Sequence, residues 1–471
     1  MLQRSKKLAC RVFAFILCLT VPLLPPVAFS GCGEPENQSL TVFCYNQDTL
    51  KLATSAIGRF EYSHPDLKVE FVEIPRFDTY IPQTDSEEKR DARAKALAKY
   101  KEELPAIYDQ VRSELIAGKG PDLIIFGTDE ISGERFFPDV YKSMASGVFT
   151  DLAPLIAADE NYEPEHLNQT VIAAGKLGER QYVMPLFYHF ETLTASSQTL
   201  AAEGFDAAKR NTCTDFYSEA ARYAAAKGAR ARKVFATPGE GMHFPELLHT
   251  NPIDYANQTA KLDTPSFQQL QEAYRELYEN DLRTPTAAGT SAIERLGEQG
   301  DSLFVKGETL KLDMIECARL LAAGSDPVFF PMRDDEGKIA AQVTVAAGIN
   351  DASRNKQNAY NFLKELLGRS VQNDDSLQPD FPVRDSLYSA YDKIYWMQIA
   401  IADNIQSKYG ELPDEFYEEV KSWMDEIGPV SFETDLPEKL YSYFEPYYKG
   451  SKPYEDCLKD AEAKLRIYVA E

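Results

Sequence analysis

Four groups of polar and aromatic residues each follow an apolar run of the sequence or end one, where α/β proteins carry ligand-binding loops. The candidate ligand-binding residues are, in chain order, Tyr45, Asn46, Asp48, Arg76, Thr128, Asp129, Phe187, Tyr188 and His189. Aromatic rings cover the apolar faces of a sugar, and carboxylates and amides exchange hydrogen bonds with its hydroxyl groups. This mixture predicts a site for a neutral, polyhydroxylated small molecule.

The same residues also have structural interpretations. Asn and Asp stabilise turns and helix starts through their own backbone hydrogen bonds, so Asp48 and Asp129 fit capping roles as well as ligand-binding ones. Tyr188 fits a ring platform for a ligand, but it also fits a core position. The alternatives differ in outcome, because losing a binding side chain lowers affinity whereas losing a core or capping side chain lowers stability.

Catalytic patterns are missing from the sequence. It has no Gly-x-Ser-x-Gly, no His-Glu-x-x-His, no phosphate loop and no Cys-x-x-Cys. Its five histidines are scattered, and a zinc site at His243 and His249 would need an acidic third ligand that the spacing does not supply. Adjacent acids such as Glu102 and Glu103 fit solvated surfaces better than a glycosidase pair. We therefore predict a protein that is not an enzyme, with no cofactor and no metal site.

The first 31 residues have the pattern of a secretion signal. A basic start that includes Arg4 and Arg11 precedes an apolar run, which is too short for a membrane span of about 20 residues. Small residues then lead directly to Cys32, as in a bacterial lipoprotein box, so we predict a lipidated, palmitate-bearing Cys32 and a polar tether over residues 32–39. Ordinary cleavage, with Cys32 as an incidental thiol, is the alternative.

Composition and charge narrow the possible partners. The chain has 471 residues, 44 % of them hydrophobic, and a formal net charge of −24. A chain of this length divides into more than one core. Its negative field repels nucleic acid, and no basic stripe offsets it. Four cysteines are widely spaced in apolar patterns and are predicted to be free thiols: Cys44, Cys213, Cys317 and Cys457.

Hydrophobic periodicity predicts an alternation of strands and helices. Strands are expected at 40–45, 68–74 and 122–126, with helices at 50–60 and 97–115, and Pro105 is expected to kink or divide the second helix. This order implies a doubly wound parallel sheet. Farther along we expect strands at 181–185 and 342–346 and helices at 215–227, 264–280, 358–367 and 454–468. The strand at 181–185 is expected to open a second lobe.

Five segments, in order, resemble the extracellular solute-binding proteins of ABC importers, the family that includes the maltose- and oligosaccharide-binding proteins. They are Ala117 to Ile124, Met144 to Leu155, Gly178 to Pro185, Ala347 to Lys356 and Tyr448 to Asp456. The chain departs from the family at Ala195-Ser196-Ser197, where an Asn is usual. The segments 78–104 and 373–445 are also longer than in a minimal member.

The resemblance implies an α/β, two-lobe, periplasmic-binding-protein-like fold of class II, each lobe a mostly parallel sheet flanked by helices, with the ligand cleft between the lobes. The expected lobes are 40–168 plus 340–395, and 169–339 plus 396–471. A monomer of this kind would capture a small solute, above all a carbohydrate, and deliver it to an ABC permease at the outer face of the cytoplasmic membrane. A lipid-anchored sensor that signals to a membrane kinase and a secreted glycosidase are the alternatives.

Overall fold

The computed structural model describes eleven stretches of the chain. They are residues 39–75, 87–128, 135–209, 212–228, 232–235, 253–280, 302–307, 310–372, 380–384, 409–432 and 434–470. The predicted signal peptide, Cys32, Arg76, Asp129, His243 and His249 lie outside these residues. Within them, no helix combines the length and the apolar character that crossing a membrane requires.

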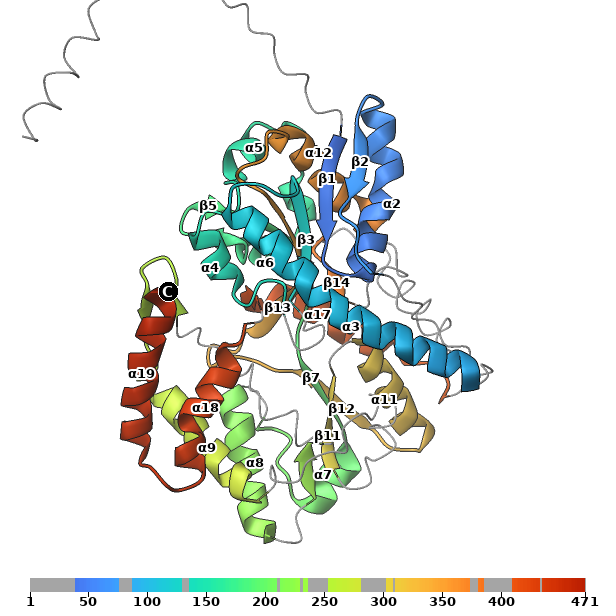
Figure 1. Cartoon of the computed structure of the whole chain (residues 1–471). Helices are drawn as coiled ribbons and strands as arrows, with labels where there is room; N and C mark the ends of the chain where they lie inside the picture. Colours follow the sequence, from blue (N-terminus) through green and yellow to red (C-terminus); the bar gives the residue numbers. More distant parts are fainter. Residues whose placement is uncertain are drawn as a thin grey trace, which may run out of the picture. The chain divides into compact units, whose positions relative to one another are not determined.

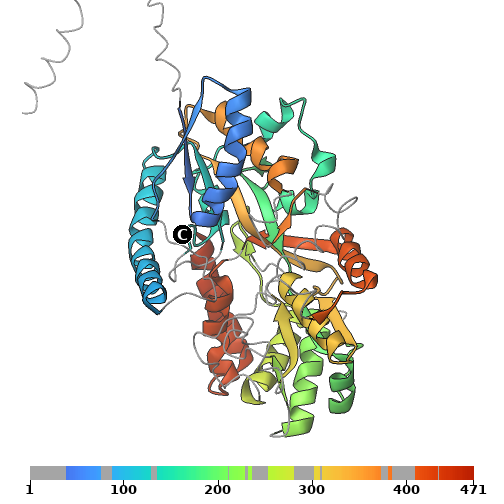
Figure 2. The ribbon, with the colours of Figure 1, turned by 90° about the vertical axis from the view of Figure 1, so that its right-hand side faces the viewer.

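The first part of the chain forms the predicted alternation of strands and helices (Figure 1). Its elements are β1 (Ser39–Cys44), α2 (Gln47–Ser63), β2 (Lys68–Phe71), α3 (Glu87–Ile116) and β3 (Leu123–Gly127). β1 pairs in parallel with β2 on one side and with β3 on the other. Because crossovers between parallel strands are right-handed, the reversal of direction around β1 places α2 and α3 on opposite faces of the sheet. Figure 2 shows the two helices on either side of these strands.

Helix α3 is continuous through Pro105, so the predicted division of this helix is wrong. A proline inside a helix removes one backbone hydrogen bond and disfavours the preceding turn. Here Leu104 and Tyr108, on either side of the proline, are both fully buried in the core. The tertiary packing of this face offsets the local cost of the proline.

The sheet grows by strands from distant parts of the chain. β13 (Ile339–Ile349) lies antiparallel to β3 and to β6 (Val183–His189), and β14 (Phe381–Pro382) extends the sheet beyond β6. The first half of β13 pairs in parallel with β15 (Ile427–Phe432). The sheet is therefore parallel around β1, as predicted, and mixed elsewhere.

A second, four-stranded sheet has the order β12-β7-β11-β8. Its strands are β7 (Thr192–Ser196), β8 (Lys233–Phe235), β11 (Ser302–Gly307) and β12 (Pro327–Pro331). Two of its pairs, β11 with β7 and β12 with β7, are antiparallel, whereas the sequence predicted a mostly parallel sheet. β7 lies between β11 and β12 and runs in the direction opposite to both, so this part of the sheet is antiparallel.

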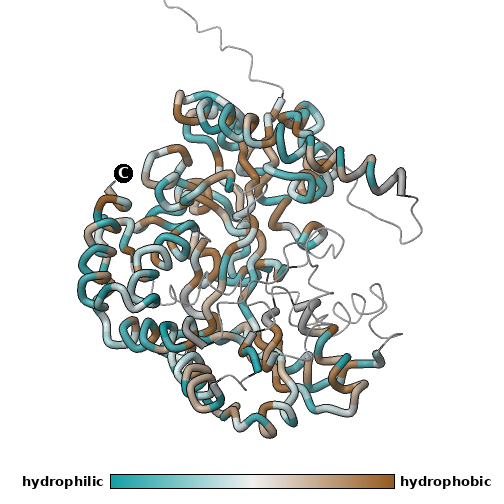
Figure 3. The backbone as a smooth tube through the Cα atoms, turned by 60° about the horizontal axis from the view of Figure 1, so that its bottom comes forward, coloured by the Kyte–Doolittle hydropathy of each residue, from teal (hydrophilic) through white to brown (hydrophobic). Residues whose placement is uncertain are grey.

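Helices and short elements complete the described chain. The longer helices are α8 (Cys213–Lys227), α9 (Pro265–Asn280), α11 (Leu310–Ala322), α12 (Lys356–Leu366), α17 (Asp414–Trp423), α18 (Leu436–Tyr448) and α19 (Tyr454–Ala470). The short elements are α4 (Val140–Ala145), α5 (Ala153–Ala157), α6 (Gln169–Ala173), α7 (Ser197–Glu203), α13 (Arg369–Gln372), two 3-10 turns (Pro164–His166 and Met424–Glu426) and the strands β4 (Lys176–Leu177), β5 (Arg180–Gln181), β9 (Ile253–Asp254) and β10 (Thr259–Ala260). Hydrophobic and hydrophilic residues alternate around the helices, as expected for helices with one buried face (Figure 3).

The described residues bury two separate hydrophobic cores. The first core surrounds the larger sheet, and the second is built by β7, β11, α8, α9, α18 and α19. The first core also takes in β6 and β15, which the sequence placed in the second lobe. The reason is strand pairing, because β13 lies next to both. The chain passes from the first core to the second between Phe190 and Leu193.

The four cysteines in the described residues are free and buried, which confirms the prediction. Burial raises the pKa of the Cys44 thiol above its usual range. The neutral thiol is a poor nucleophile, so Cys44 acts as a small packing residue.

Candidate functional site

The ends of three strands meet at one edge of the larger sheet. β1 and β3 are parallel, and β6 runs in the same direction as β3 because both are antiparallel to β13. The ends of β3 and β6 lie at the same position along β13, because Val345 of β13 pairs with both Gly127 and Phe187. The structure therefore brings most of the predicted residues to this edge, namely Tyr45, Asn46, Thr128, Phe187, Tyr188 and His189.

Asn46 and Asp48 lie at the start of α2 and interact within that helix. The Asn46 Oδ1 accepts hydrogen bonds from the backbone N–H of Thr49 at 2.8 Å and from the Thr49 hydroxyl at 2.9 Å. This is a capping box, which satisfies backbone groups that the first helical turn leaves open. Asp48 is 52 % exposed and pairs with Lys51 at 2.9 Å, so its carboxylate remains accessible.

Replacing Asn46 with alanine should lower the free energy of unfolding by about 1 kcal/mol, the usual loss when an N-cap side chain is removed. Denaturant unfolding of the purified chain measures the change. The matched control is Asp48→Ala, two residues along in the same first turn, which should change stability by no more than about 0.5 kcal/mol because the residue is exposed. An unchanged midpoint for Asn46→Ala would contradict the capping role.

Tyr45 and Thr128 are buried at the ends of β1 and β3. The Tyr45 carbonyl accepts a hydrogen bond from the Tyr108 hydroxyl at 2.8 Å, and the Thr128 hydroxyl donates to the carbonyl of Val343 at 2.9 Å. These contacts fix the strand ends against α3 and β13. Both residues therefore shape the sheet edge.

Phe187 and Tyr188 are also buried. The Tyr188 hydroxyl lies 3.4 Å from the Met424 sulfur, and its ring centroid lies 5.8 Å from that of Phe381. Its ring is fully buried and presents no face to solvent in this structure. This placement matches the core interpretation of Tyr188 and does not match the predicted ring platform.

His189, at the end of β6, is half-buried and reaches across to β13. Its Nε2 lies 3.3 Å from the Oε1 of Gln342. Thr344 lies two residues after Gln342 on β13. Its hydroxyl is buried and has no hydrogen-bond partner among the described residues. Gln342 and Thr344 share one face of the strand because side chains alternate along it. Buried polar atoms without partners are uncommon, so Thr344 marks a place for an additional polar group.

Gln342 and Thr344 were not among the residues predicted from sequence. The signal was present, since they are the two polar residues, spaced two apart, of an otherwise small and apolar strand. Together with His189 they offer an imidazole, an amide and a hydroxyl, each able to hydrogen-bond the hydroxyls of a ligand. No group of three or more histidine, cysteine or acidic side chains suited to a metal ion occurs among the described residues.

Solved structures with a similar fold are sugar-binding proteins. The sugar-binding protein MalE of Xanthomonas citri matches with a TM-score of 0.61 and 11 % identity, over 92 % of this chain and 97 % of that one. The galacto-N-biose- and lacto-N-biose-binding protein of a Bifidobacterium longum ABC transporter matches at 0.55 and 13 % identity, over 92 % and 98 %. The cyclic maltosyl-maltose-binding protein of Arthrobacter globiformis matches at 0.54 and 13 % identity, over 92 % and 98 %.

The chain has the two-lobe periplasmic-binding-protein-like fold. The fold class predicted from sequence is thereby confirmed, and the match extends over nearly the full length of each of these proteins. No protein-family model and no curated protein sequence matches the chain. Because the sequence identity to these structures is low, their similarity to this chain shows a shared fold only. The ligand of this chain must be inferred from its own side chains.

Proposed function

We propose that this chain is a solute-binding protein that captures a carbohydrate and delivers it to an ABC importer. The observation that carries the proposal is the set of polar groups at the edge of the larger sheet, in a fold that the solved sugar-binding proteins share. His189, Gln342 and Thr344 are assigned to the ligand's hydroxyls. Tyr45, Phe187 and Tyr188 form the wall behind them.

Three more of the predicted ligand residues keep a role in the proposal. Asp48 is exposed near the same edge and is able to accept hydrogen bonds from a sugar. Arg76 and Asp129 follow β2 and β3 in the sequence, where the parallel strands end. The proposal also includes closure of the two lobes around the bound ligand. It further includes delivery of that ligand to the importer's permease.

A thermal-shift screen tests the ligand class. The purified chain is heated with monosaccharides, disaccharides and linear and cyclic oligosaccharides, and separately with peptides, amino acids and metal ions. A ligand present at 100 times its dissociation constant stabilises the folded state by about 2.7 kcal/mol, which is a measurable shift in melting temperature. Shifts confined to peptides, amino acids or metal ions would contradict the carbohydrate assignment.

The site assignment makes a separate prediction. Once a sugar is found, His189→Ala and Gln342→Ala should each weaken its binding roughly fivefold, the loss expected when one net hydrogen bond of about 1 kcal/mol disappears. Titration calorimetry measures the affinities. Gln357→Ala is the control, because this exposed residue on α12 hydrogen-bonds Asn361 of the same helix and its loss should leave affinity unchanged. Equal affinities for all variants would place the ligand elsewhere.

Lipid anchoring through Cys32 is a second part of the proposal, supported by the signal-like sequence before it. Membrane fractionation of Cys32→Ala tests the anchor independently of the ligand. The sensor alternative uses the same receptor, and neighbouring permease or kinase genes distinguish it. The glycosidase alternative predicts sugar turnover, which chromatography of an incubated oligosaccharide detects.

A further inference from the structure

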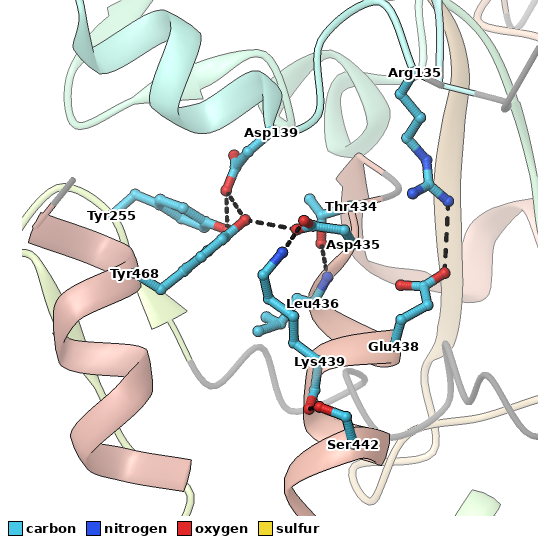
Figure 4. A network of polar contacts seen from close by, with 10 residues as sticks. All are labelled: Arg135, Asp139, Tyr255, Thr434, Asp435, Leu436, Glu438, Lys439, Ser442 and Tyr468. Carbon is cyan, nitrogen blue, oxygen red and sulfur yellow. Dashed lines mark hydrogen bonds and ion pairs between the residues drawn. The ribbon is translucent and has the colours of Figure 1, made fainter. Parts of the chain in front are cut away.

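A network of polar side chains connects the two hydrophobic cores at Asp139 (Figure 4). Asp139 precedes α4, whose residues belong to the first core, and it is buried. Its Oδ2 accepts hydrogen bonds from the hydroxyls of Tyr255 at 2.9 Å and Tyr468 at 2.6 Å. Tyr255 lies in the β9–β10 turn and Tyr468 on α19, and both elements pack into the second core.

The network continues along α18. The Tyr468 hydroxyl also lies 3.1 Å from Asp435, which forms an ion pair with Lys439. On the other side of the ring, the Lys142 ammonium group lies 3.7 Å from the Tyr468 ring centroid. A cation in this position is attracted by the ring's electron density. The end of α19 is therefore held by groups from α4 and α18 together.

A second connection runs through Arg135, which links the end of β3 to α18. Its Nε donates to the Thr128 carbonyl at 3.0 Å, and a terminal nitrogen lies 3.8 Å from the Glu438 carboxylate. The Arg135 side chain is only 6 % exposed, so its charge is poorly hydrated and depends on these partners. This link begins at the sheet edge that carries the candidate site.

Both tyrosine hydroxyls act as donors at neutral pH. Burial, together with the nearby charge of Asp139, raises the pKa of Tyr255 and of Tyr468 well above the usual range. A protonated hydroxyl has one hydrogen to give, and the shorter contact shows that Tyr468 gives it to Asp139 rather than to Asp435. Asp139 thus receives a hydrogen bond from each of the two second-core elements.

The geometry suits a contact that opens and re-forms. The Asp139 Oδ1 accepts from the backbone N–H of Lys142 at 3.1 Å, so α4 itself holds the carboxylate in place. If the cores move apart, the two bonds to Oδ2 break and water replaces them, and the Lys142 contact with the Tyr468 ring and the stacking of Tyr141 on Tyr255 are lost as well. Exchange of hydrogen bonds with water costs little free energy, whereas parting an apolar interface exposes its whole area.

We propose that Asp139, Tyr255 and Tyr468 form a polar latch that holds the two cores in the arrangement of this structure and that releases when they move apart. The Tyr141 ring, stacked on Tyr255 at 4.8 Å, aligns the Tyr255 hydroxyl with the carboxylate. The latch does not depend on the class of ligand. Asp435, which contacts Tyr468, and Glu438, which contacts Arg135, both lie at the start of α18, so this helix start adjoins both the latch and, through the Arg135 bond to Thr128, the edge of the candidate site.

Small-angle X-ray scattering of the full chain without ligand tests the latch. Tyr468→Phe removes one donor and keeps the ring, and Asp139→Asn weakens the acceptor while keeping a good helix cap. Both variants should show a larger radius of gyration and a longer maximum dimension than the wild type. Tyr62→Phe is the control, because Tyr62 is 90 % exposed, and its profile should match the wild type.

Hydrogen exchange adds a local readout on the same samples. In both variants the amides of α4 and of the last turns of α19 should exchange faster, while those of β1 and β3 keep their protection. Scattering profiles identical to the wild type would overturn the proposal even if the melting temperature falls, because such a result describes a packing contact. Since no ligand is added, the outcome does not depend on whether the chain binds a sugar.

Discussion

Replacing Tyr188 with alanine should lower the free energy of unfolding by about 3–5 kcal/mol, the range for truncating a large buried aromatic residue. The side chain is fully buried beside Phe381 and Met424, so its loss leaves a cavity in the first core. Denaturant unfolding followed by circular dichroism measures the change. The melting temperature of the unliganded variant should fall with it.

Two further variants separate burial from ligand contact. Tyr188→Phe keeps the ring and should retain most of the stability, while Tyr62→Ala at an exposed position should change it by no more than about 0.5 kcal/mol. A ring that serves mainly as a ligand platform would behave differently. In that case Tyr188→Ala would leave the melting temperature unchanged and weaken sugar binding.

Gly175→Ala should destabilise the chain by about 3 kcal/mol, at the upper end of the usual range for overpacking. A Cβ atom at this position would lie 1.9 Å from the backbone oxygen of Val183 and 2.7 Å from the Gln181 side-chain nitrogen. The Gly175 carbonyl also accepts hydrogen bonds from the backbone N–H groups of Tyr182 and Val183. The two backbones therefore cannot separate to make room without losing these bonds.

This glycine matters for the candidate site because it supports the start of β6, the strand that ends at His189. Thermal unfolding measures the effect. Gly58→Ala is the matched control, since nothing lies within 4 Å of a Cβ added there on α2. Alanine favours a helix over glycine by up to about 1 kcal/mol, so this control should be slightly more stable than the wild type. A Gly175→Ala variant as stable as the wild type would contradict the close backbone approach.

The sequence was informative where structure follows from local pattern. The strands and helices from β1 to β3 agree with the periodicity of their apolar residues, and α12 and α19 follow from theirs. The partners of β13 had no such signal. Val345 pairs with Gly127 and Phe187, residues far away in the sequence, and nothing local specifies those pairs. Local pattern therefore did not show that β6 and β15 join the first core.

The candidate site was predictable by position but not by side-chain direction. Strand ends located the sheet edge correctly, whereas the alternation of side chains decides which residues point inward. Tyr188 and Thr128 point into the protein, and His189 remains half-buried. The same alternation places Gln342 and Thr344 on one face of β13. A polar residue at a strand end can also stabilise the next helix instead of binding a ligand, and the Asn46 side chain does so by capping α2.

The repeated passage of the chain between the two cores has a consequence for the order of folding. The first core needs β1 beside β13 and β15, and the second needs β7 together with α18 and α19. Contacts between residues so far apart in sequence form slowly, because the entropy of closing a long loop is lost before the contacts stabilise the chain. Neither core is complete until residues beyond 412 have been made, so the packing of both cores is finished only late in synthesis.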